Sequence, residues 1–275
     1  MLDKEKTMAN KRFWLVMALV FGMAVVGCDD GLSDDDGLSD NDGELVTTKT
    51  INTKWEINDS NSPYSSFEFT VDNIYIVITN KNLNGAQLSR GRAADIQESN
   101  LSPIRTGKYR IDGDNIILEG FGVLNIVSLT AEEFIFSFKL ENTNETYEYH
   151  ALKTEDLINE SSRTNMLCRF WRFDKYLSLS EDFPEGAKRE NRSFGILYSK
   201  AGTYLVVNND GSAGLADWRW ENSEETTFHY SWNNWESYGI VEIIELTTTK
   251  YVNKGYFVPP GEHLWEVLEF FPDEL

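Results

Sequence analysis

The sequence predicts an all-β protein made of two tandem eight-stranded antiparallel meanders, each closed into a barrel or packed as a sandwich. Three observations predict this fold class. From residue 46 onward, short runs rich in Val, Ile, Thr, Tyr and Phe recur about every 8 to 15 residues between Asn, Asp and Gly. No helix-length period of 3.6 residues persists in this region. The second half of the region also repeats the motif order of the first half.

The strands of the first half are bounded by turn residues. The segment IDGDNI (111–116) is typical of a hairpin with an Asp-Gly turn, where glycine supplies the positive φ. The connection 80–105 is long and polar, and we expect a short helix around Ala93–Gln97. We expect strands at 52–58, 65–71, 73–79, 106–112, 115–119, 122–129, 133–139 and 145–152.

The second half repeats the first at low identity but in the same order. Trp55 in Lys54–Glu56 corresponds to Trp171 in Phe170–Arg172, and each opens its half. The other correspondences are Phe69–Ile78 with Leu197–Val207, Gly107–Ile111 with Ala216–Trp220, Ile126–Thr130 with Ile243–Thr247, and Tyr147–Tyr149 with Trp265–Val267. The repeat predicts β domains at 47–160 and 161–275.

The N-terminus has the pattern of a secretory signal peptide at 1–27, with either Met1 or Met8 as its start. Lys11 and Arg12 precede 14 uncharged, mostly apolar residues (13–26). That run is shorter than the roughly 20 residues needed to span a bilayer.

The segment VVGC, ending at Cys28, resembles the lipobox of bacterial lipoproteins. The resemblance implies diacylglyceryl transfer to the Cys28 sulfur and cleavage just before this residue. With Cys28 acylated, Cys168 would have no partner in the chain, and we expect it to be a buried, unpaired thiol.

Residues 28–46 form an acidic segment that predicts a flexible tether. Residues 29–44 hold eight acids and no base, and glycine recurs every six residues. The spacing fits no EF-hand register, so we expect no calcium site. Acids after a lipidated cysteine resemble sorting signals either for inner-membrane retention or for surface export, and the sequence does not choose between them.

The composition is strongly acidic, with 25 basic and 45 acidic residues and a net charge of −20. Removal of residues 1–27 would make the chain more negative still. Such a surface repels phosphate backbones and anionic headgroups. We therefore expect neither nucleic-acid binding nor electrostatic docking on a membrane.

Each half resembles the small lipocalin-like domain of bacterial envelope lipoproteins. In the first half the resemblance rests on Trp55, the Phe-rich hairpin after it, GKYRIDGDNI and IVSLT. The second half departs from the pattern, because ENSEET replaces the Asp-Gly turn and WNNWES is inserted. The resemblance implies eight-stranded barrels that hold a small apolar ligand or nothing.

The sequence carries no catalytic constellation. His150, His229 and His263 each lie apart from other candidate metal ligands, and no nucleophile elbow, phosphate-binding glycine loop or dinucleotide fingerprint occurs. We therefore expect no enzymatic activity, no metal and no cofactor. A hydrolase with paired carboxylates is the third and least favoured reading.

The most distinctive segment, 217–240, is rich in aromatic residues. In one interpretation these rings pack the second core. In the other, Trp232, Trp235 and Tyr238 lie at a barrel rim, where they would stack on a sugar or peptide or bind a protein partner. Glu242 shares a strand face with Ile240 and would need a ligand or a basic partner if that face points inward, although the opposite face is nearly as plausible inside. The candidate ligand-binding residues are Trp218, Trp220, Tyr230, Trp232, Trp235, Tyr238 and Glu242.

The favoured function is a non-catalytic binding module for a small apolar or glycan ligand. It would be lipid-anchored in the cell envelope, on the inner or outer membrane of a diderm bacterium. The alternative is a protein-interaction module, such as an adhesin or inhibitor, acting through loops 80–105, 179–192 and 233–238. A cavity in the second β domain would favour the first function.

Overall fold

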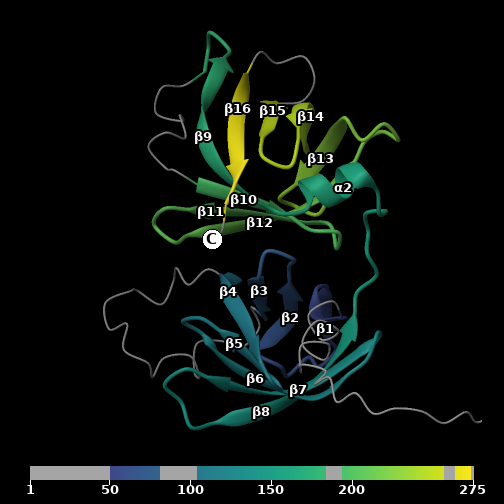
Figure 1. The fold of residues 1–275 in the computed structure, drawn as a ribbon, viewed down its shortest axis with the longest axis vertical. Helices are drawn as coiled ribbons and strands as arrows, with labels where there is room; N and C mark the ends of the chain where they lie inside the picture. The colour runs from purple at the N-terminus through teal and green to yellow at the C-terminus, as the bar shows by residue number, and fades with distance from the viewer. Residues whose placement is uncertain (1–49, 81–103, 184–193, 257–263, 274–275) are drawn as a thin grey trace, which may run out of the picture. The chain divides into compact units, whose positions relative to one another are not determined.

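The computed structural model describes residues 50–80, 104–183, 194–256 and 264–273. They form two closed eight-stranded barrels in tandem (Figure 1). In each barrel every strand pairs antiparallel with the next one along the chain, and the last strand pairs with the first. The predicted all-β fold is thereby confirmed, and barrels are selected over sandwiches. The predicted signal peptide, Cys28 and the tether lie outside the described residues, as does the helix expected around Ala93–Gln97.

All eight strands predicted for the first barrel are present, with ends displaced by two residues at most. Gly113 has a φ of 59° in the turn where Asp112 pairs with Asn115, as the Asp-Gly hairpin requires. The strands are β1 (Lys54–Ile57), β2 (Tyr64–Phe69), β3 (Ile74–Thr79), β4 (Ile104–Asp112), β5 (Asn115–Leu118), β6 (Gly122–Leu129), β7 (Glu133–Leu140) and β8 (Thr146–Lys153).

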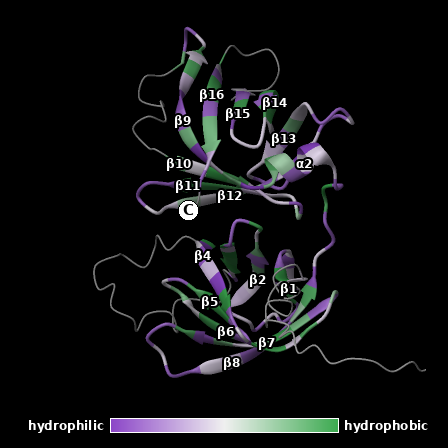
Figure 2. Ribbon diagram, viewed as in Figure 1, coloured by the Kyte–Doolittle hydropathy of each residue, from purple (hydrophilic) through white to green (hydrophobic). Residues whose placement is uncertain are grey.

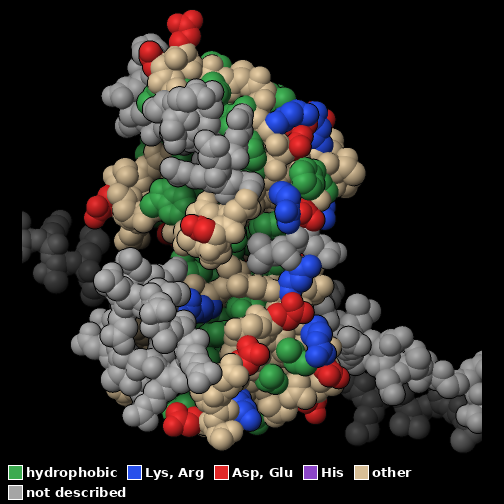
Figure 3. Space-filling view, turned by 90° about the vertical axis from the view of Figure 1, so that its left-hand side faces the viewer, with side chains coloured by type: hydrophobic (Ala, Val, Ile, Leu, Met, Phe, Trp, Pro, Cys, Tyr) green, Lys and Arg blue, Asp and Glu red, His purple; other side chains and the backbone are tan. Residues whose placement is uncertain are grey.

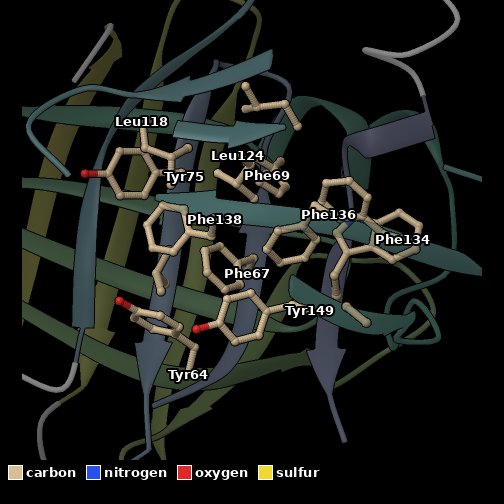
Figure 4. Packing of buried hydrophobic residues seen from close by; sticks show 14 of the residues in the cluster. Tyr64, Phe67, Phe69, Tyr75, Leu118, Leu124, Phe134, Phe136, Phe138 and Tyr149 are labelled. Atoms are coloured by element: carbon tan, nitrogen blue, oxygen red, sulfur yellow. The ribbon is translucent and has the colours of Figure 1, made fainter. Parts of the chain in front are cut away.

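Aromatic side chains pack the interior of the first barrel (Figure 4). The ring of Phe67 lies 5.2 Å from that of Phe136 and 5.6 Å from that of Phe138, both edge-on. Edge-to-face contacts at this distance stabilise a core beyond the area they bury. Along the strands, apolar residues that face this core are interspersed with polar ones (Figure 2), as the two-residue period of a strand requires. The first barrel thus has an interior packed with side chains.

A short helix and eight strands build the second barrel. Helix α2 (Ser162–Leu167) is capped by Ser161, whose hydroxyl accepts a hydrogen bond from the Thr164 amide at 2.9 Å. The strands are β9 (Phe170–Leu179), β10 (Phe194–Tyr198), β11 (Thr203–Asn208), β12 (Ala213–Trp220), β13 (Thr227–Ser231), β14 (Gly239–Leu246), β15 (Tyr251–Tyr256) and β16 (Trp265–Pro272). Cys168, just after α2, is a free thiol in the second core, as predicted, and burial raises its pKa.

The internal repeat is visible in the hydrogen bonds. Trp55 and Trp171 each donate from the indole nitrogen to the carbonyl oxygen four residues earlier, at 3.0 Å in both cases. A β-bulge also interrupts β6 after Ile126 and β14 after Ile243, at equivalent places in the two barrels. These shared irregularities show that the two barrels repeat each other in structure as well as in sequence.

The last predicted correspondence, between the two final strands, is wrong by one residue. Counting from the shared bulge, Phe138 on β7 is equivalent to Gly255 on β15. Phe138 pairs with Tyr147 and Gly255 pairs with Glu266, so Tyr147 corresponds to Glu266 and not to Trp265. The difference matters because a shift of one residue moves a side chain to the other face of its strand. Glu266 therefore points into the second barrel.

The two barrels belong to one compact unit of the chain, and side chains from both meet in it. Ile74 and Ile76 of the first barrel share an apolar cluster with Leu197 of the second. Beside this cluster, the buried carboxylate of Glu68 accepts a hydrogen bond from the Thr203 hydroxyl at 2.7 Å. Burial raises the pKa of Glu68, because a charged carboxylate is poorly solvated there.

Candidate binding site

The two barrels differ at two equivalent positions, and at these positions the second barrel has a cavity. The positions of Phe136 and Phe138 in the first barrel are taken by Asn253 and Gly255 in the second. The loss of two phenyl rings leaves a partly enclosed cavity of about 20 Å³, roughly the space that one water-sized group needs. Its lining residues are Ile196, Tyr198, Tyr204, Tyr230, Val241, Asn253, Gly255, Glu266, Leu268 and Phe270.

The polar part of the lining combines a carboxylate, an amide and phenol groups. Glu266 is 1% exposed, and Asn253 is also buried. The hydroxyl of Tyr198 lies 3.4 Å from that of Tyr251, whose hydroxyl also interacts with the Asn253 side chain. Burial raises the pKa of Tyr251, which keeps its hydroxyl protonated. The cavity thus offers hydrogen-bonding groups around one carboxylate.

Aromatic rings lead from the cavity to the surface. Tyr198 and Tyr204 stack with ring centres 5.0 Å apart, and Tyr204 lies 5.3 Å from Tyr230. The ring of Trp232 is 5.8 Å from Tyr204 and 6.1 Å from Tyr230, and Trp232 is 52% exposed. Trp232 therefore extends the aromatic lining of the cavity into solvent.

The loop that carries Trp232 is fixed by its own hydrogen bonds. The Ser231 hydroxyl accepts from the Trp235 amide at 2.8 Å and donates to the Ser237 carbonyl at 2.7 Å. The Asn233 side chain adds bonds to the Ser237 hydroxyl and amide. Trp235 has a φ of 68°, a conformation that costs a bulky residue on the order of 1–3 kcal/mol. The hydrogen bonds offset this cost and hold the loop in one shape.

No protein-family model matches the chain, and no curated protein matches it either. Within the described ranges, no three His, Cys, Asp or Glu side chains are grouped to hold a metal ion. The helices of those ranges also include none with the length and apolarity to cross a membrane.

The structure corrects the assignment of two candidate residues, Trp218 and Trp220. Trp218 is 1% exposed and donates from its indole nitrogen to the Ser199 carbonyl at 2.9 Å. Trp220 packs against the same core and donates to the Thr164 hydroxyl of helix α2 at 3.0 Å. Both tryptophans stabilise the barrel, as the packing interpretation expected.

The predicted rim group of Trp232, Trp235 and Tyr238 is divided between two places. Trp232 lies beside the cavity, whereas the other two cover side chains of the outer wall. The guanidinium carbon of Arg219 is 3.9 Å from the ring centre of Trp235, and Tyr238 stacks on His229 at 4.5 Å. Of the predicted binding residues, the structure thus brings only Tyr230 and Trp232 together at the cavity.

Glu242 is exposed, so of the two faces of β14 that the sequence left open, the one with Glu242 does not point inward. The buried face of β14 carries Val241 and Ile243, the opposite alternation. The carboxylate inside the barrel is Glu266, which the sequence reasoning missed. The sequence pattern that indicates the inward position of Glu266 is its alternation with Leu268 and Phe270 in WEVLEFF, which puts all three side chains on one face of the strand.

Proposed function

We propose that the protein is a lipid-anchored lipoprotein of the cell envelope and that its second barrel is a non-catalytic binding module for a glycan. One observation carries the binding function: the half-exposed residue Trp232 contacts two of the tyrosines that line the cavity containing Glu266 and Asn253. The first barrel, with phenyl rings at the equivalent positions, would serve as a scaffold.

The size of the cavity favours a glycan over an enclosed apolar ligand. Pockets that enclose small molecules usually measure about 300–1,000 Å³, whereas this cavity measures about 20 Å³. A sugar can lie outside it, with the C–H face of one ring on Trp232 and a polar substituent in the cavity. Asn253 and Glu266 would then bind that substituent by hydrogen bonds.

A protein-interaction module is the second candidate function, supported by apolar exposure on the outer wall. Tyr238 is 47% exposed and Ile244 is 59% exposed. Loops 80–105 and 179–192, proposed for the same role, lie largely outside the described residues. A partner captured by the protein and lost with Tyr238→Ala, but kept with Trp232→Ala, would favour this candidate. The face in Figure 3 shows acidic and basic side chains interspersed, without a single dominant charge.

Trp232→Ala should weaken glycan binding by roughly 30-fold, because truncation of a central aromatic contact typically costs about 2 kcal/mol or more. Trp235→Ala is the matched control, since it removes the same side chain from the outer wall of the same loop. Titration with tetrasaccharides of glucose, glucosamine and N-acetylglucosamine, followed by calorimetry, measures both. Equal losses in the two variants would contradict the assignment of Trp232.

Cys28→Ser should release the protein from membranes. Each buried CH₂ contributes about 0.8 kcal/mol, so anchoring by two or more acyl chains is stable, and without the thiol no chain can be attached. Fractionation of cells, together with the mass of the mature N-terminus, checks this prediction. A wild-type protein that is soluble and unmodified at Cys28 would show that no lipid anchor exists.

A further inference from the structure

We infer that the cavity of the second barrel binds a primary ammonium group, so that the ligand is an amine-bearing glycan, a sugar with a free amino group. This inference rests on the proposed function, because it names the ligand class for the same site. It depends on three properties of the cavity: its charge, its rings and its size.

The charge of the lining favours a cation. Glu266 is the only one of the ten lining residues with a carboxyl group, and none of them is basic. An ammonium group beside a carboxyl group favours its ionised form. A carboxylate can accept hydrogen bonds at about four positions, so a ligand ammonium would add to the contacts that Glu266 already makes. In a site shielded from water, the attraction between opposite charges is stronger than at the surface.

The rings and the neutral polar groups of the lining also suit an ammonium. Tyr198, Tyr204 and Tyr230 all border the cavity, and the face of a tyrosine ring attracts a cation. An ammonium group has three donors. The Glu266 carboxylate, the Asn253 carbonyl oxygen and a tyrosine hydroxyl oxygen can accept them.

In the second barrel the space and the carboxyl group occur together. Where the first barrel has Phe138 paired with Tyr147, the second has Gly255 paired with Glu266. A Cβ atom on Gly255 would meet nothing closer than the Glu266 Cγ at 4.0 Å, so the missing ring leaves real space beside the carboxylate. A cavity of about 20 Å³ has room for a water-sized group, which suits a primary ammonium better than a bulkier trimethylammonium.

The test uses the full chain in detergent, at a pH where the sugar amine is protonated. We expect the β-1,4-linked tetrasaccharide of glucosamine to bind at least tenfold more tightly than its N-acetylated and all-hydroxyl counterparts. We also expect propylammonium, but not tetramethylammonium, to compete with it. Glu266→Gln, which keeps the shape of the side chain, should abolish the preference. Glu242→Gln removes the same charge from the exposed face of β14 and should leave the preference intact.

The outcomes separate the inference from the proposed function. If all three tetrasaccharides bind equally well and Glu266→Gln changes nothing, the ammonium site is wrong and the glycan module stands. If propylammonium binds in a Glu266-dependent way while no sugar binds, the ammonium site stands and the glycan function fails. Should Glu266→Gln not fold, Glu266→Asp retains the charge and should keep the amine preference at lower affinity. Loss of that preference in a folded Glu266→Asp protein, with sugar binding intact, would also overturn the inference.

Discussion

Replacing Trp171 with alanine should lower the free energy of unfolding of the second barrel by about 3–5 kcal/mol, the usual cost of deleting a buried aromatic side chain. Trp171 is fully buried, packs against Tyr251 at 5.4 Å and donates a hydrogen bond to the Leu167 carbonyl. The substitution removes the packing and the hydrogen bond together. Urea denaturation followed by circular dichroism measures the loss.

Two further variants show whether the packing and the hydrogen bond of Trp171 both contribute. Trp171→Phe keeps a ring but loses the donor, so it should cost less than the alanine variant and still measurably destabilise. Trp235→Ala, on the outer wall, should cost about 1 kcal/mol or less, as a surface cation–π contact would. A Trp171→Ala protein as stable as Trp235→Ala would contradict the core described for the second barrel.

Filling the cavity with Gly255→Val should weaken glycan binding and leave the barrel as stable as before or more stable. The first atoms of a new side chain meet only the Glu266 Cγ at 4.0 Å, so they have space. Valine also suits the middle of a strand better than glycine does. We expect at least a tenfold loss of affinity, measured by calorimetry, together with an unchanged or higher melting temperature.

Stability and binding are read from the same Gly255→Val sample, so misfolding cannot imitate the predicted result. A folded variant with unchanged affinity would show that the ligand does not use the cavity. A variant with a lower melting temperature would show that the space beside Glu266 is smaller than the geometry indicates.

The sequence predicts the fold well because strand signals are local. The alternation of apolar residues and the Gly113 turn depend on neighbours in the chain, and they place all eight strands of the first barrel within two residues. The repeat is also recoverable, since Trp55 and Trp171 make the same indole bond in each barrel. Closure into a barrel depends on pairing between strands that are far apart in the chain, so the sequence alone did not distinguish barrels from sandwiches.

The candidate site was only partly predictable, because burial depends on pairing between distant strands. Alternation alone allowed either face of β14 to point inward, and the pairing of Phe228 with Val241 decided against Glu242. The one-residue error in the last correspondence hid the inward position of Glu266. The division of Trp232 from Trp235 follows from the loop conformation, including the positive φ of Trp235, which no local pattern signals.

The most direct test of the binding site is the nuclear magnetic resonance spectrum of the indole N–H groups, with ¹⁵N-labelled tryptophan in the full chain. Among the described residues, Trp55 lies in a core, Trp235 on the outer wall and Trp232 beside the cavity. On saturation with the glucosamine tetrasaccharide, we expect the Trp232 signal to shift while those of Trp55 and Trp235 stay in place. A shift of Trp55 or Trp235 with Trp232 unchanged would contradict a ligand site at the second-barrel cavity.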